Sequence, residues 1–212
     1  MRHFLIYQLL ILLVLAGCTT KSNQPDSVVD QTAKNESTRL FFDVHDLEPG
    51  KIDLNAVAGA HQKDLATQGK YGVNITKYYV DNEKGKVYCI AEARDSASLY
   101  ETHKEAHGLV PSHIREIAGE VSQATRPGAT LFMDIHRLGP GNVTASDAAH
   151  AHEKDLATQE KYNTKFVNYW VDEKAGTVMC LVESADSASI ANVHKEAHGL
   201  LPAQIFKVAE GH

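Results

Sequence analysis

The heptapeptide HKEAHGL occupies residues 103–109 and occurs again, unchanged, at residues 194–200. A shift of 91 positions aligns residues 40–119 with residues 131–210 without a gap, and 39 of the 80 aligned positions are identical. Each copy is long enough to hold several secondary-structure elements, unlike the short unit of a solenoid. The chain therefore contains one domain twice. Repeat 1 spans residues 38–119 and repeat 2 spans residues 130–212, with a linker at 120–129.

The pattern of apolar residues predicts the same elements in both repeats. In repeat 1 we expect strands at 40–47, 73–81, 87–92 and 113–117, where apolar residues alternate or β-branched and aromatic residues gather. Helices are expected from Asp53 to about Lys70 and from Asp95 or Ser96 to Gly108, because these residues favour helix ends. The resulting order, βαββαβ, predicts an α+β fold of the ferredoxin-like type.

One such repeat would leave a face of its sheet uncovered, since both helices pack on the other face. Small domains bury too little apolar surface to leave that face in water. The second repeat is the simplest cover. We therefore expect the two repeats to pack sheet against sheet as an internal pseudo-dimer, in which repeat 2 replaces the partner subunit of a homodimer.

The N-terminal segment differs from the repeats. Residues 1–18, MRHFLIYQLLILLVLAGC, combine one arginine, an apolar run and a cysteine after small residues. The run is short for a membrane span and has the layout of a secretory signal, while LAGC at 15–18 resembles the bacterial lipobox. An ordinary cleaved signal and an uncleaved anchor are the alternatives. Residues 19–37 are polar and predict a flexible tether. We thus expect a lipid on Cys18 and a location at the cell envelope, facing the periplasm or the exterior.

Charge and histidine content narrow the choice of partner. The formal net charge of −6 argues against nucleic acid, because phosphate binding needs a basic surface. Twelve histidines are more unusual. Eight of them match in pairs under the 91-residue shift, which favours a common role. The pairs are His45 and His136, His61 and His152, His103 and His194, and His107 and His198.

The spacing of His103 and His107 places their imidazoles one turn apart on one helical face, where they can share a metal ion. An isolated HxxxH pattern is a weak signal, because such rings often bond only to backbone or water. The zinc-protease motif is absent, since Lys104 follows the first histidine.

Acidic residues accompany the other histidines. Asp43 and His45 alternate on a strand and so share a sheet face, and we expect Glu92 on the same face. Asp64 follows His61 by one helical turn and could orient its ring. A buried set of this kind is costly unless it is paired or metal-bound. The equivalent acids in repeat 2 are Asp134, Asp155 and Glu183.

Cys89 and Cys180 form a further matched pair on the third strand of each repeat. Their alternation with Glu92 predicts a position on the helix-packed side. Each is either a small buried side chain or a thiolate ligand of the metal. A disulfide between the repeats is a third interpretation, but opposite sheet faces would hold the two sulfurs too far apart.

Taken in order, FFDVHDL, AHQKDLATQGKYG, KVYCIAEA and HKEAHGL resemble the motifs of a bacterial domain family that includes nickel-binding proteins. The resemblance covers both repeats nearly end to end. It implies ferredoxin-like domains, usually single and dimeric, and Ni²⁺ or a similar ion at positions that match the histidines. This chain departs from the common form because it is duplicated and has a lipoprotein-like N-terminus, so sites formed between separate subunits could be rearranged.

The leading hypothesis is a lipid-anchored protein that binds a divalent transition metal for storage, buffering or delivery. Imidazole and carboxylate ligands suit nickel, zinc, copper and cobalt, and the resemblance favours nickel. One alternative is an oxygenase- or isomerase-like enzyme that uses Asp43, His45 and Glu92 in the cavity between the sheets. No nucleophile–base set or cofactor motif supports it. The other alternative is a metal-free interaction module with structural histidines.

Overall fold

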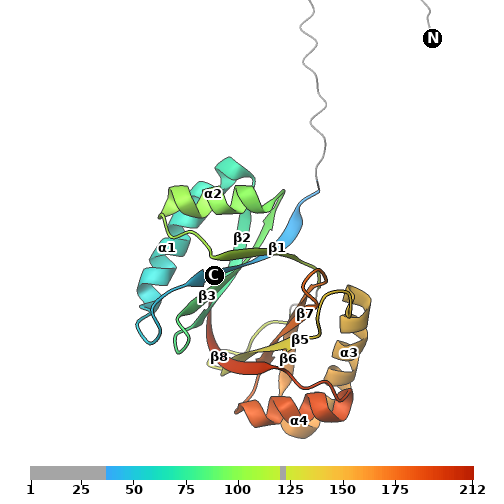
Figure 1. Ribbon diagram of the computed structural model, residues 1–212. Coiled ribbons are helices and arrows are strands. Elements are labelled where there is room, and N and C mark those ends of the chain that lie inside the picture. Colours follow the sequence, from blue (N-terminus) through green and yellow to red (C-terminus); the bar gives the residue numbers. More distant parts are fainter. Residues whose placement is uncertain (1–36, 120–122) are drawn as a thin grey trace, which may run out of the picture. The chain divides into compact units, whose positions relative to one another are not determined.

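The computed structural model describes residues 37–119 and 123–212. Repeat 1 contains β1 (Arg39–Asp46), α1 (Leu54–Thr67), β2 (Asn74–Asp81), β3 (Lys86–Ala93), α2 (Ser96–Ala106) and β4 (His113–Ile117). Repeat 2 contains β5 (Leu131–Arg137), α3 (Ala145–Thr158), β6 (Lys165–Asp172), β7 (Thr177–Glu183), α4 (Ser187–Ala197) and β8 (Gln204–Gly211). Short 3-10 turns, η1 (Gln68–Tyr71) and η2 (Gln159–Tyr162), follow α1 and α3. The α+β order βαββαβ is confirmed in both repeats (Figure 1).

The expected signal, Cys18 and nearly all of the expected tether lie outside the described residues, as do positions 120–122 of the linker. Contacts group Glu36–His212 in one compact unit. Within the described part of the chain, none of the helices has the length and apolar character needed to cross a membrane.

Local sequence determines where the helices begin and end. The Asp53 carboxylate accepts a hydrogen bond from the backbone of Asn55 at the start of α1, and Asp95 does the same for Ser98 at the start of α2. Helix α2 ends at the cap residue His107, and Gly108 then adopts a φ of +79°, which glycine tolerates best. Helix α1 is shorter than expected, because its last turn tightens into η1.

The strands form one continuous hydrogen-bonded order, β4-β1-β3-β2-β8-β5-β7-β6. The repeats join where Tyr78–Val80 of β2 pairs with Ala209–Gly211 of β8. The two outer strands also meet, since Ala118 and Val171 exchange backbone hydrogen bonds of 2.8 and 2.7 Å. The sheet thereby closes on itself like a barrel, which leaves no long unpaired edge among the described strands.

Apolar side chains from both repeats fill the interior of this barrel. Trp170 of repeat 2 packs against Phe42 of repeat 1, with ring centroids 6.1 Å apart, and Phe206 packs against Tyr88 at 5.8 Å. This shared core confirms the sheet-against-sheet pseudo-dimer. On the outer faces, α1 and α2 lie side by side over repeat 1, and α3 and α4 do so over repeat 2 (Figure 1). Each helix pair covers a separate apolar core.

Candidate metal centre

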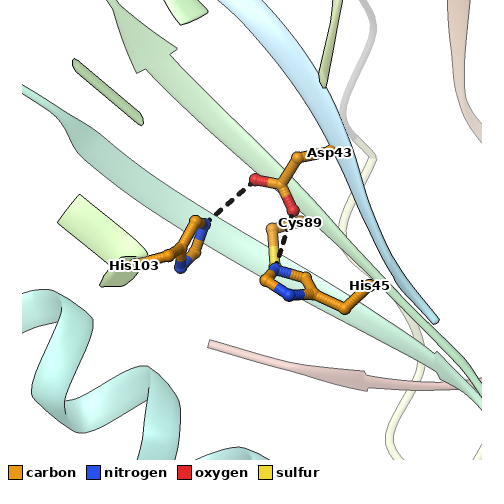
Figure 2. A group of neighbouring side chains, drawn as sticks. All are labelled: Asp43, His45, Cys89 and His103. Carbon is orange, nitrogen blue, oxygen red and sulfur yellow. Dashed lines mark hydrogen bonds and ion pairs between the residues drawn. The ribbon is translucent and has the colours of Figure 1, made fainter. Parts of the chain in front are cut away.

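Strand β1 directs Asp43 and His45 towards the helices. Its alternate residues, Phe42 and Val44, belong to the barrel interior, so Asp43 must point the other way. Asp43 is paired in register with Cys89 of β3, which faces the same side. His103 of α2 approaches from above this face. Asp43 lies between His103 and His45, with Cys89 beside them (Figure 2).

His103 is fully buried and stands between two carboxylates. Its Nε2 lies 3.2 Å from Oδ2 of Asp43, and its Nδ1 lies 3.0 Å from Oδ1 of Asp64. Nε2 of His45 is 3.1 Å from the other oxygen of Asp43, but the geometry is not that of a hydrogen bond, and this oxygen has no donor among the described residues. Donor atoms of Asp43, His45, Cys89 and His103 all lie within 4.8 Å of one another.

His107 closes a second group with Asp64 and His103. Its Nε2 lies 3.2 Å from Oδ2 of Asp64. Its Nδ1 accepts a hydrogen bond of 3.1 Å from the backbone N–H of Leu109, so the proton of a neutral ring sits on Nε2 and is donated to Asp64. His107 therefore holds Asp64 in place in this arrangement.

Repeat 2 builds the same centre from Asp134, His136, Cys180 and His194, with Asp155 and His198 beside it. Nε2 of His194 lies 3.1 Å from Asp134, and Nε2 of His136 lies 3.2 Å from the second oxygen of Asp134. One carboxylate oxygen of Asp134 and one of Asp155 are without a hydrogen-bond donor among the described residues. The backbone of Leu200 donates to Nδ1 of His198, as Leu109 does to His107. The duplication has thus preserved the residues and the contact between Asp134 and His194, whereas Nδ1 of His194 lies 3.2 Å from Nε2 of His198 and 3.1 Å from Oδ1 of Asp155.

The two aspartates decide the charge on the central histidine. Burial alone would lower the pKa of His103, but hydrogen bonds to Asp43 and Asp64 outweigh it and raise the pKa to about 9. The same balance raises the pKa of His194 to about 9. Burial would raise the pKa of Asp64, yet its bonds to His103 and His107 lower it to about 2. Without metal, each centre is an imidazolium held between two carboxylates.

The cysteines lie on the helix-packed side, as predicted. Cys89 and Cys180 are buried and free, so they form no disulfide, in agreement with the expected separation of the two sulfurs. Burial, together with the charge of Asp43, raises the pKa of the Cys89 thiol well above its usual range. Burial and Asp134 have this effect on the pKa of Cys180. Both thiols therefore carry their protons at neutral pH.

His61 and His152 do not enter these groups. The His61 ring packs against Tyr78 with centroids 5.0 Å apart, and its Nδ1 has no partner among the described residues. The expected pairing with Asp64 is not formed, because Asp64 bonds to His103 and His107 instead. Burial lowers the pKa of His61 and keeps its ring neutral. His152 packs similarly on Tyr169 at 4.8 Å, and burial also lowers its pKa.

The expectation that Glu92 shares a face with Asp43 is wrong. Glu92 pairs in register with Leu40, three residues before Asp43, so it points to the opposite face, where Asn74 donates to it at 3.2 Å. Its equivalent, Glu183, binds the linker through the backbone N–H of Arg126 at 2.6 Å. An opening of about 840 Å³ between the sheets is lined by Glu92 but not by Asp43 or His45. The three residues of the enzyme alternative are therefore not assembled.

Comparisons with known proteins agree with the duplication. The model of a family described as nickel responsive protein SCO4226-like matches residues 41–117 and again residues 132–208. Among solved structures, SCO4226 from Streptomyces coelicolor A3(2) is 35% identical over a match that covers 35% of this chain and 90% of that chain, with a TM-score of 0.34. A comparison with curated proteins finds no match.

More distant structures resemble both repeats together. A putative monooxygenase from Lactobacillus acidophilus NCFM is 10% identical, with 81% of this chain and 94% of that chain covered and a TM-score of 0.43. A heme-binding protein from Thermus thermophilus is 13% identical, with 83% and 92% covered and a TM-score of 0.43. With these identities and TM-scores, neither supports a statement about the function of this chain.

Proposed function

The chain belongs to the SCO4226-like family of nickel-responsive proteins, and we propose that each repeat binds one divalent transition metal ion, nickel in the first place, at its buried Asp–His centre. One observation carries the proposal. The same four donors recur in both repeats, and in each a fully buried carboxylate oxygen lies beside an imidazole nitrogen without a hydrogen bond. A buried carboxylate oxygen is costly to leave unpaired, and a cation would satisfy it.

The residues present fit such an ion. Asp43, His45 and Nε2 of His103 would hold it in repeat 1, and Asp134, His136 and Nε2 of His194 in repeat 2. These donors suit nickel, zinc, copper and cobalt. A neutral imidazole coordinates through one nitrogen, so the Nδ1–H of His103 would remain bonded to Asp64, an arrangement common behind metal-bound histidines. Because His103 takes part in both candidate groups, we propose one ion per repeat rather than two.

The metal-free centre is also stable, since the protonated His103 ring bonds to both aspartates. An ion must displace that proton in order to bind. Reversible exchange of a metal for a proton, with the fold intact on both sides, suits storage, buffering or delivery better than a structural metal site. The thiols are protonated and would add a ligand only after losing a proton.

We also propose that a lipid on Cys18 holds the protein at the cell envelope, facing the periplasm or the exterior. The support is the apolar run that leads into LAGC at 15–18. Metabolic labelling with a radioactive fatty acid should mark the full chain, and Cys18→Ala should abolish the label. A labelled Cys18→Ala variant, or an unlabelled wild type, would contradict the anchor.

The metal proposal is tested by calorimetric titration of residues 36–212 with Ni²⁺, Zn²⁺, Cu²⁺ and Co²⁺ after chelation. We expect about two ions per chain and a higher midpoint of thermal unfolding with the ion that binds. His45→Ala/His136→Ala should weaken binding at least tenfold. The control, His113→Ala/His150→Ala, removes two exposed histidines and should bind as the wild type does.

Two outcomes would contradict the proposal. If none of the four ions binds or raises the midpoint, the histidines are structural, as in a metal-free interaction module. If the control variant loses as much affinity as the His45→Ala/His136→Ala variant, the ions bind to surface histidines.

A further inference from the structure

Repeat 1 contains a partly open cavity of about 300 Å³ between α1 and the sheet, beside the candidate metal centre. Most of its wall is carbon, and its polar lining residues include His45, His61, Asp64 and His107. An apolar cavity of about 150 Å³ already stays dry and accepts benzene. A concave, mostly apolar space with few polar groups is typical of small-molecule sites. The apolar wall is formed by Leu47, Ile52, Val57, Val87 and Leu109.

His61 is the polar group of this wall that the metal centre leaves unexplained. Its side chain is only 4% exposed, and its ring makes no hydrogen bond with the described residues. A buried polar group without a partner destabilises the fold, because the hydrogen bonds it makes with water in the unfolded chain are not replaced. His61 lies on the cavity wall, and a molecule in the cavity could supply the missing partner.

The matching space in repeat 2 measures only about 110 Å³. It is lined by the matching residues His136, His152, Asp155 and His198, so the histidines and the aspartate beside the metal centre are the same in both repeats. The mouth differs. Ile52 and Val57 are only partly buried in repeat 1, whereas their counterparts Val143 and Ala148 are buried in the apolar core of repeat 2. A metal site would explain the polar residues that both cavities share, but it does not explain why the apolar space is larger in repeat 1.

We propose that the cavity of repeat 1 binds a small organic molecule with an apolar ring or chain and one uncharged hydrogen-bonding head, which pairs with the ring of His61. The volume and carbon wall select the apolar body, and the unpaired imidazole selects the head. Repeat 2 has the same imidazole but too little space for such a body. Binding of this molecule does not depend on the metal centre being filled.

Benzimidazole is a suitable probe, because it is a flat two-ring molecule with one N–H donor and one nitrogen acceptor. It is titrated into residues 36–212 in the presence of a chelator, with binding followed by calorimetry and by amide chemical shifts. We expect one molecule per chain, with shift changes in α1 and not in α3. His61→Phe, which removes the head's partner, and Ala60→Phe, which fills the cavity, should each weaken binding tenfold or more. His152→Phe, the matched change in repeat 2, should leave binding unchanged.

The shift changes in the wild-type chain test the proposal even if a variant fails to fold. Absence of saturable binding, shift changes spread equally over α1 and α3, or equal losses in His61→Phe and His152→Phe would overturn it. Because the chelator removes metal from the titration, failure of the metal proposal leaves this result unaffected, and the converse also holds.

Discussion

Nδ1 of His103 lies 3.0 Å from Oδ1 of Asp64, although the two residues are 39 positions apart and come from different helices. The contact joins α1 to α2, and through Nε2 of His103 it also joins both helices to Asp43 on β1. A single buried ring thus connects two helices and a strand on the outer face of the sheet. His103 is also the residue whose ring must lose its Nε2 proton before a metal ion can bind there.

Replacing His103 by glutamine should therefore destabilise the metal-free protein. Asp43 and Asp64 would remain buried without their cation, and breaking a buried charge pair in this way costs about 3–5 kcal/mol. Urea unfolding of residues 36–212 measures the loss. Lys104→Gln, one position away on the exposed face, should change the unfolding free energy by less than about 0.5 kcal/mol. A loss of under about 1 kcal/mol in His103→Gln would mean that Asp43, His103 and Asp64 do not form a charged unit.

The unfolding free energy should also depend on pH on both sides of neutrality. The pKa of His103 is raised to about 9, so its contribution is full below the unfolded pKa of about 6.5 and is lost as the pH rises through 9. The pKa of Asp64 is lowered to about 2, so its contribution is full above about 4 and is lost as the pH falls towards 2. Without metal, stability should be greatest between about pH 4 and 6.5.

Urea unfolding at a series of pH values from about 5 to 10 measures the alkaline limb, where we expect a loss on the order of 3 kcal/mol per repeat. His103→Gln/His194→Gln removes both titrating rings and should flatten this limb. A wild-type curve that is already flat between about pH 6.5 and 10 would contradict the assignment of a raised pKa to His103 and His194.

The sequence predicted the fold well because the fold depends on local patterns. Asp53 and Asp95 cap the expected helices, and His113–Ile117 is a strand over the expected residues. The duplication predicted the pseudo-dimer, because the uncovered sheet face of each repeat needs another apolar face to pack against. The closing contact between Ala118 and Val171 was not predictable, because pairing of the outer strands depends on sheet twist rather than on local composition.

The site was harder to assemble from the sequence. Strand alternation predicts that Asp43 and His45 share a face, but it does not fix the register between β1 and β3. The expectation that Glu92 lies on that face was therefore wrong. Helical spacing suggested that Asp64 orients His61. In the structure α2 packs on α1, and Asp64 instead forms hydrogen bonds with His103 and His107. Contacts between elements far apart in sequence leave no periodic signal. The exact repetition of HKEAHGL was the best indication of them.

The shared barrel core predicts that neither repeat is stable without the other. Met133 on β5 is fully buried among side chains of both repeats. Met133→Ala should lower the unfolding free energy by about 2–5 kcal/mol, because it leaves a cavity in a closed interior. The exposed Leu201→Ala serves as the control and should change it by less than about 0.5 kcal/mol. A single unfolding transition in both variants would show one cooperative unit, and two separate transitions would argue against a shared core.

Metal binding should release protons, and the number released reports on His103 and His194 directly. At neutral pH both rings are protonated, since each has a pKa raised to about 9 by its two aspartates. An ion that takes Nε2 must expel that proton, so we expect about one proton per ion bound, and the observed affinity should rise with pH until it levels off near the pKa of these rings. Calorimetric titration with Ni²⁺ in buffers of different ionisation enthalpy measures the proton count.

His107→Gln is the informative comparison, because it removes a hydrogen bond to Asp64 but no proposed ligand, and it should keep the proton release while weakening binding. Affinity that is independent of pH between about 6 and 9 would place the ion away from His103 and His194.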